Sequence, residues 1–191
     1  MYITPSENRK IGKVYINLVD ILYAIVLAQG FVYLSSNSGF FSWITSGDII
    51  SIWNTLNAYT LVVGSWIRYH ASVENYPEGS LRFVIDVILM FLYYLAFVKA
   101  SSALITVAIF VIVFSLYSVW SALRIREYPE SRRSVWTFGI RLSITFTFLC
   151  LILGISGYFH FFLTPLRAVP LFLWIIVTIY TLLPYIHFGE L

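Results

Sequence analysis

Long apolar runs, separated by short polar or charged segments, account for most of this chain. Runs of about 20 apolar residues are long enough to cross a bilayer as helices. Polar segments such as Ser35–Gly39 and the charged run Arg124–Arg133 separate these runs. The pattern predicts six transmembrane helices, at 14–34, 49–69, 81–99, 101–123, 136–161 and 168–187.

Composition supports an all-α, polytopic membrane protein. Hydrophobic residues make up 60% of the chain and charged residues only 11%, whereas soluble domains carry roughly 25% charged residues. Six spans with short connections use nearly all of the 191 residues. We therefore expect one transmembrane domain over 1–191, with no separate soluble domain.

The distribution of lysine and arginine predicts the orientation. One side of the six predicted spans carries Arg9, Lys10, Lys13, Arg68, Arg82, Arg124, Arg126, Arg132, Arg133 and Arg141, and the other carries Lys99 and Arg167. Because positive residues accumulate on the cytoplasmic side, both termini are expected in the cytoplasm.

Several function classes find no support in the sequence. The basic residues lie beside apolar runs, as orientation signals do, which argues against nucleic-acid binding. Cys150 is the only cysteine and the three histidines are scattered, so neither a disulfide nor a metal site is expected. We find no catalytic motif. The protein is expected to be neither an enzyme nor a cofactor carrier.

The first span has one face that changes from polar to apolar. Residues at helical spacing on this face are Asn17, Asp20, Ala24, Leu27 and Phe31. An ionisable group inside a membrane span is a candidate functional group. Two interpretations stay open: a helix that lines a gated pore, or a helix packed on polar neighbours.

Charges in other spans lie at a similar cytoplasmic depth. Arg82 and Asp86 are four residues apart, a spacing that allows an ion pair on one helix surface. Such a pair could simply fix the depth of its helix. Alternatively, Asp20, Arg82, Asp86 and Arg141 could form one ionic network that links the first, third and fifth spans.

Two further groups of residues favour helix packing. Asn54 and Asn57 lie on one face of the second span, where amides commonly bridge helices. Gly154 and Gly157 in the fifth span allow close approach of a neighbouring helix.

The segment Asp20–Ile25 resembles the first helix of the transmembrane protein 175 family of prokaryotic and lysosomal potassium channels. In that family, an aspartate that ends a phenylalanine-serine-aspartate signature is followed, after two residues, by an aromatic residue, alanine and isoleucine. The end of the second span, with Trp66 and His70, is similar to the family's second helix. The resemblance implies a homo-oligomeric channel lined by the first helix. The constriction positions that it implies are among Leu22, Ile25, Leu27 and Gln29. With Asp20, Ala24 and Phe31 from the polar-to-apolar face, these residues make up the predicted pore-lining or gate set.

Three functional hypotheses follow. The first is an oligomeric cation channel, selective for potassium-like monovalent ions, in a prokaryotic plasma membrane, with a hydrophobic gate. The second is a non-conducting sensor or scaffold that docks a cytoplasmic protein on Arg124–Arg133. The third is a small transporter that uses Asp20 as a proton or cation site.

Overall fold

The computed structural model describes residues 5–35, 48–73, 79–128, 133–159 and 168–188. It confirms the all-α expectation. The described residues form six long helices: α1 (Pro5–Ser35), α3 (Ile49–Val73), α4 (Ser80–Val98), α5 (Ala103–Glu127), α6 (Arg133–Phe159) and α7 (Val169–Phe188). Helix α1 begins nine residues before the apolar run (14 − 5 = 9), at Pro5, because proline is well suited to the first position of a helix.

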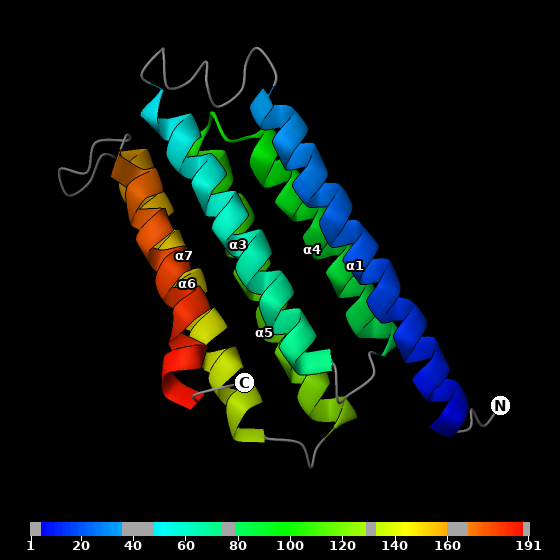
Figure 1. The fold of residues 1–191 in the computed structure, drawn as a ribbon. Coiled ribbons are helices and arrows are strands. Elements are labelled where there is room, and N and C mark those ends of the chain that lie inside the picture. The colour runs from blue at the N-terminus through cyan, green and yellow to red at the C-terminus, as the bar shows by residue number, and fades with distance from the viewer. Residues whose placement is uncertain (1–4, 36–47, 74–78, 129–132, 160–167, 189–191) are drawn as a thin grey trace.

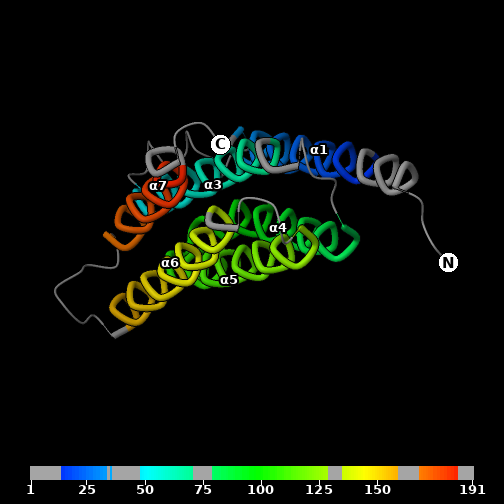
Figure 2. The backbone as a smooth tube through the Cα atoms, turned by 90° about the horizontal axis from the view of Figure 1, so that it is seen from below, coloured from blue at the N-terminus to red at the C-terminus, as the bar shows by residue number. Residues whose placement is uncertain are grey.

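The helices are arranged in two layers. Helices α1, α3 and α7 form one layer, and α4, α5 and α6 form the other (Figure 2). Successive helices run in opposite directions, so the start of α1 and the end of α7 lie at the same end of the bundle (Figure 1). We call this the terminal end.

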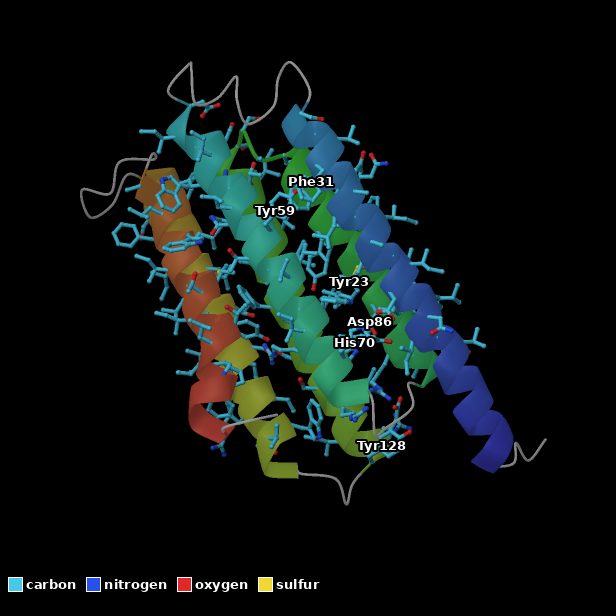
Figure 3. The ribbon with its side chains drawn as sticks, in the orientation of Figure 1. Tyr23, Phe31, Tyr59, His70, Asp86 and Tyr128 are labelled. Carbon is cyan, nitrogen blue, oxygen red and sulfur yellow. The ribbon has the colours of Figure 1, made fainter. Side chains whose placement is uncertain are left out.

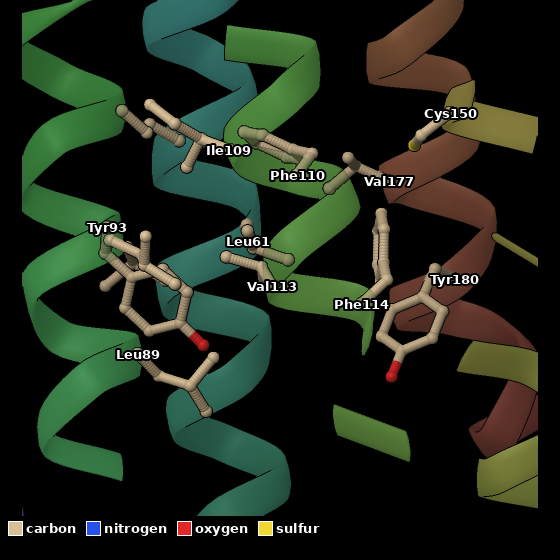
Figure 4. Close-up of a cluster of buried hydrophobic side chains, with 14 of the residues drawn as sticks. Leu61, Leu89, Tyr93, Ile109, Phe110, Val113, Phe114, Cys150, Val177 and Tyr180 are labelled. Atoms are coloured by element: carbon tan, nitrogen blue, oxygen red, sulfur yellow. The ribbon is translucent and has the colours of Figure 1, made fainter. Parts of the chain in front are cut away.

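The core lies between the two layers (Figure 4). Phe110, Val113 and Phe114 of α5 are fully buried at its centre. The ring of Phe114 packs edge-on against Tyr180 of α7, with 4.6 Å between ring centroids. The central position of α5 explains why its apolar residues do not follow one narrow stripe: it contacts neighbours on several sides.

Four helices contain segments long and apolar enough to cross a membrane: Val14–Tyr33, Ser80–Val98, Ala103–Glu127 and Val135–Tyr158. A shorter apolar helix spans Val169–Pro184. Helix α3 is more polar, since it carries Ser51, Asn54, Thr55 and Asn57, all of which are buried inside the bundle. Hydropathy therefore identifies a multi-pass membrane protein.

Helices α3 and α7 approach closely at Gly64. A Cβ atom on this residue would lie 2.5 Å from Thr181 Cγ2. We expect Gly64→Ala to push the two helices apart and to lower the free energy of unfolding by about 1–2 kcal/mol. Denaturant unfolding in detergent micelles measures this change.

Two further variants test the cause. Adding Thr181→Ala to Gly64→Ala removes the clashing methyl group and should restore part of the loss. Gly154→Ala is the matched control, because its Cβ would lie 3.2 Å from one Val107 methyl, an easier contact to relieve. Equal losses at Gly64 and Gly154 would contradict the steric explanation.

Candidate functional site

Helix α1 is the least covered of the four long apolar helices. Only 22% of its membrane segment is buried, compared with 50% for α4. Val19, Tyr23, Val26 and Gly30 face the rest of the bundle. The opposite face is exposed, and its members are Val14, Asn17, Leu18, Ile21, Ala24, Ile25, Ala28, Gln29, Phe31 and Val32.

The structure places the predicted pore residues in two groups. Ala24, Ile25, Gln29 and Phe31 are exposed on the outer surface of α1. Asp20, Leu22 and Leu27 are half-buried, and the two leucines pack against the core. Only part of the predicted set is therefore available to line a space outside this chain.

The polar-to-apolar face of α1 lies at the border between its exposed surface and its contact with α3, since Asn17, Ala24 and Phe31 are exposed while Asp20 and Leu27 are half-buried. At its polar end Asp20 contacts His70, and at its apolar end Phe31 packs on Tyr59 with ring centroids 5.7 Å apart. Figure 3 shows this pair far from the terminal end, with His70 and Asp86 much nearer to it. The exposed residues Ile21 and Ile25 lie beside this face on the helix surface.

Asp20, Trp66 and His70 form a polar cluster between α1 and α3. The carboxylate oxygen Asp20 Oδ1 lies 2.7 Å from His70 Nε2 and accepts a 3.3 Å hydrogen bond from Trp66 Nε1. The side chains of Asp20 and His70 are 36% and 42% exposed. The residues that carry the family resemblance in the two segments therefore meet in space, on the outer surface of the bundle.

Two of the four charges expected to form one network, Arg82 and Asp86, both contact Trp120 of α5, whereas Asp20 contacts His70. Arg82 Nε donates a 2.6 Å hydrogen bond to Glu127 at the end of α5. Asp86 accepts a 3.2 Å bond from Trp120 Nε1. Arg141 is exposed on α6, and α6 and α1 lie at opposite edges of the two layers (Figure 2).

Sequence reasoning missed Glu127 and Trp120 as the partners of these charges. Both are on α5, and their positions depend on the register between α4 and α5. The Arg82 guanidinium also lies 5.3 Å from the centre of the Trp120 ring, within range of a cation–π interaction.

Arg124 is part of the interior of the bundle. Its side chain is fully buried, and its guanidinium lies 5.1 Å from the Tyr128 ring and 4.9 Å from the Trp136 ring. A cytoplasmic partner docking on the predicted Arg124–Arg133 segment would therefore contact Arg126, which is exposed, rather than Arg124. Residues 129–132 lie outside the described ranges.

A layer of buried and half-buried hydroxyl side chains crosses the bundle and includes one residue from every described helix. Its members are Tyr23 of α1, Ser65 of α3, Tyr93 of α4, Tyr117 of α5, Ser143 of α6 and Tyr180 of α7. We call this set the hydroxyl belt.

Hydrogen bonds join the hydroxyl belt in two parts. Ser65 Oγ lies 2.7 Å from Tyr23 OH and 2.8 Å from Tyr93 OH, and Tyr93 OH is hydrogen-bonded to Tyr117 OH. The Tyr117 ring stacks on that of Tyr180, with 5.6 Å between centroids, and Tyr180 OH lies 2.9 Å from Ser143 Oγ. The sequence signal that could have predicted this belt is the presence of tyrosines inside otherwise apolar spans.

Each of the two buried asparagines of α3 links this helix to a different part of the bundle. Asn54 Nδ2 donates a 2.7 Å hydrogen bond to the carbonyl of Ala100, between α4 and α5. Asn57 Nδ2 donates a 2.9 Å bond to the carbonyl of Pro170 at the start of α7. Of the two glycines, Gly154 lies against Val107 of α5 and Gly157 is buried.

Within the described ranges, His, Cys, Asp and Glu side chains form no cluster of three that could hold a metal ion. Comparisons with protein-family models, with curated proteins and with solved structures find no match to this chain.

Proposed function

We propose that the protein is a homo-oligomeric cation channel in a prokaryotic plasma membrane, with six transmembrane helices and cytoplasmic termini. Copies of α1 surround the pore, which conducts potassium-like monovalent ions. The observation that carries this proposal is the surface of α1, which is the least covered of the four long apolar helices and exposes two amide side chains, Asn17 and Gln29.

The polar groups on this surface argue against simple contact with lipid. Asn17 and Gln29 are exposed and make no hydrogen bond to any described residue. Polar side chains that face hydrocarbon are unfavourable. By contrast, the exposed residues of α7 within the described range are all apolar: Leu171, Phe172, Ile175, Ile179 and Leu182. Water in a pore, or polar groups of a second subunit, would supply hydrogen bonds to the amides of Asn17 and Gln29.

Exposed apolar residues on the same helix supply a gate. Ile21, Ile25 and Val32 lie on the outer surface of α1. A ring of such side chains from several copies would narrow a pore and exclude water, which is how hydrophobic gates close. The contact of Asp20 with Trp66 and His70 supports the resemblance, because it joins the residues on which the resemblance rests.

The topology of six spans rests on helix direction and charge. The two ends of the described chain lie at one end of the bundle (Figure 1). We count helix α3 among the six spans although it is more polar than the others. It lies between α1 and α7, and its polar residues are buried against the other helices and do not face lipid. Lysine and arginine residues concentrate towards the terminal end, which favours an orientation with this end in the cytoplasm.

Reconstitution into liposomes with a potassium gradient tests the proposal. We expect the purified oligomer to conduct potassium, and Ile25→Ser to raise the flux severalfold because a polar ring admits water more easily. Ile112→Ser, on the exposed surface of α5, is the matched control and should leave flux unchanged. A folded protein that remains monomeric in bilayers, or an oligomer without cation flux, would overturn the proposal.

A further inference from the structure

Arg141 is an exposed cation on the membrane surface of the bundle. It lies eight residues after the start of α6 at Arg133 (141 − 133 = 8), which is about 12 Å along the helix. The described residues provide no carboxylate within salt-bridge distance of it. Because a guanidinium stays charged at every physiological pH, its side chain must extend towards water or towards an anion at the interface.

An open groove of about 180 Å³ lies between α5 and α6, and one of its lining residues, Ile144, follows Arg141 by about one helical turn. It is lined by Ser115, Ser118, Ile144, Thr147 and Phe148. Ile144 and Phe148 follow Arg141 by three and seven residues, so the three side chains share one face of α6.

The register of the two helices places Arg141 at the terminal end of this groove. Gly139 of α6 faces Ser121 of α5, and Gly154 faces Val107, so α5 and α6 run antiparallel. Arg141 is therefore level with α5 near residue 119, just beyond the groove residue Ser118 and about one helical turn beyond Ser115. Further towards the terminal end, α5 exposes Ala122 and then a second cation, Arg126.

The hydroxyl groups in the groove already have partners. Ser115 Oγ donates a 2.8 Å hydrogen bond to Val111 O, Ser118 Oγ donates to Phe114 O at 3.2 Å, and Thr147 Oγ1 donates to Ser143 O at 2.8 Å. Since each hydroxyl is satisfied within its own helix, the groove offers mainly apolar contacts to an occupant. Its chemistry suits a hydrocarbon chain.

We propose that the α5–α6 surface binds one anionic phospholipid, with its phosphate at Arg141 and an acyl chain in the groove. Charge complementarity selects the headgroup. Two exposed arginines, Arg141 and Arg126, attract an anionic headgroup and repel the choline of a zwitterionic lipid. The small side chain of Ala122 leaves room between them.

Lipid titration of the full chain in phosphatidylcholine nanodiscs tests this assignment, with phosphatidylglycerol as the probe. Retained lipid is counted by native mass spectrometry, and the thermal unfolding midpoint is measured in parallel. We expect selective retention of phosphatidylglycerol by the wild type and roughly tenfold weaker retention by Arg141→Gln. Lys99→Gln is the matched control, since Lys99 is an exposed cation at the other end of the bundle.

Two more variants separate the headgroup from the acyl chain. Arg141→Lys keeps the charge and should retain part of the selectivity. Ser118→Phe fills the groove and should weaken retention while Arg141 is intact. Circular dichroism and elution volume show whether Arg141→Gln folds. If the folded variant retains phosphatidylglycerol like the wild type, the proposal is overturned. Equal loss of phosphatidylcholine and phosphatidylglycerol would also overturn it.

Discussion

Replacement of Arg82 with methionine should lower the free energy of unfolding by about 3–5 kcal/mol, the range for breaking a buried ion pair from one side. Arg82 is fully buried, and its Nε atom lies 2.6 Å from Glu127 Oε2. Methionine preserves much of the apolar volume but leaves Glu127 without this partner. It also removes the cation over the Trp120 ring.

Denaturant unfolding in mixed micelles measures this loss, and Glu127 gives a matched comparison. Its side chain is 26% exposed, so water can solvate Glu127 after Arg82→Met, whereas Glu127→Gln leaves the buried Arg82 guanidinium without a carboxylate and should be at least as damaging. Arg126→Met controls for loss of positive charge at the same end of the bundle, since Arg126 is exposed. A loss at Arg82 no larger than that at Arg126 would show that the buried pair contributes little.

The helices themselves were predictable from the sequence because membrane spans obey a strong constraint. Backbone polar groups in hydrocarbon must be satisfied within the segment, so long apolar runs become helices. The predicted range 101–123 corresponds to α5 at Ala103–Glu127, and 168–187 corresponds to α7 at Val169–Phe188. The main difference is α1, whose polar first turns precede the apolar run and could not be recognised by hydropathy.

The contacts between helices were less predictable. Asn54 and Asn57 could be expected to bridge helices, because an amide in an apolar span needs a partner. Their acceptors, the carbonyls of Ala100 and Pro170, depend on how the two layers meet. The sequence indicated the need for a hydrogen bond and could not identify the partner.

The placement of charges shows the same limit. Arg82 and Arg141 have similar predicted depth, yet Arg82 is buried beside Glu127 and Arg141 is exposed on α6. Depth follows from position along a helix. Whether a side chain faces the core or the membrane follows from the rotation of that helix, which is set by its packing against all of its neighbours.

Tyr93→Phe should lower the free energy of unfolding by about 2–3 kcal/mol, the largest loss that we predict outside the ion pair of Arg82 with Glu127. The change removes only the hydroxyl group and keeps the buried ring. That hydroxyl is hydrogen-bonded to both Ser65 and Tyr117, so its removal breaks the hydroxyl belt between α3 and α5. Thermal unfolding in micelles or nanodiscs measures the effect.

The neighbouring tyrosine provides the control for this prediction. Tyr94 is exposed on the outer surface of α4, and Tyr94→Phe should change stability by less than about 0.5 kcal/mol. Tyr23→Phe removes a terminal member of the hydrogen-bonded series and breaks only its bond to Ser65, so its effect should be intermediate. This order, Tyr93 above Tyr23 above Tyr94, is expected if the belt acts as a connected series of hydrogen bonds. Equal effects of Tyr93→Phe and Tyr23→Phe would contradict the prediction, because Tyr93→Phe removes two of these hydrogen bonds and Tyr23→Phe removes one.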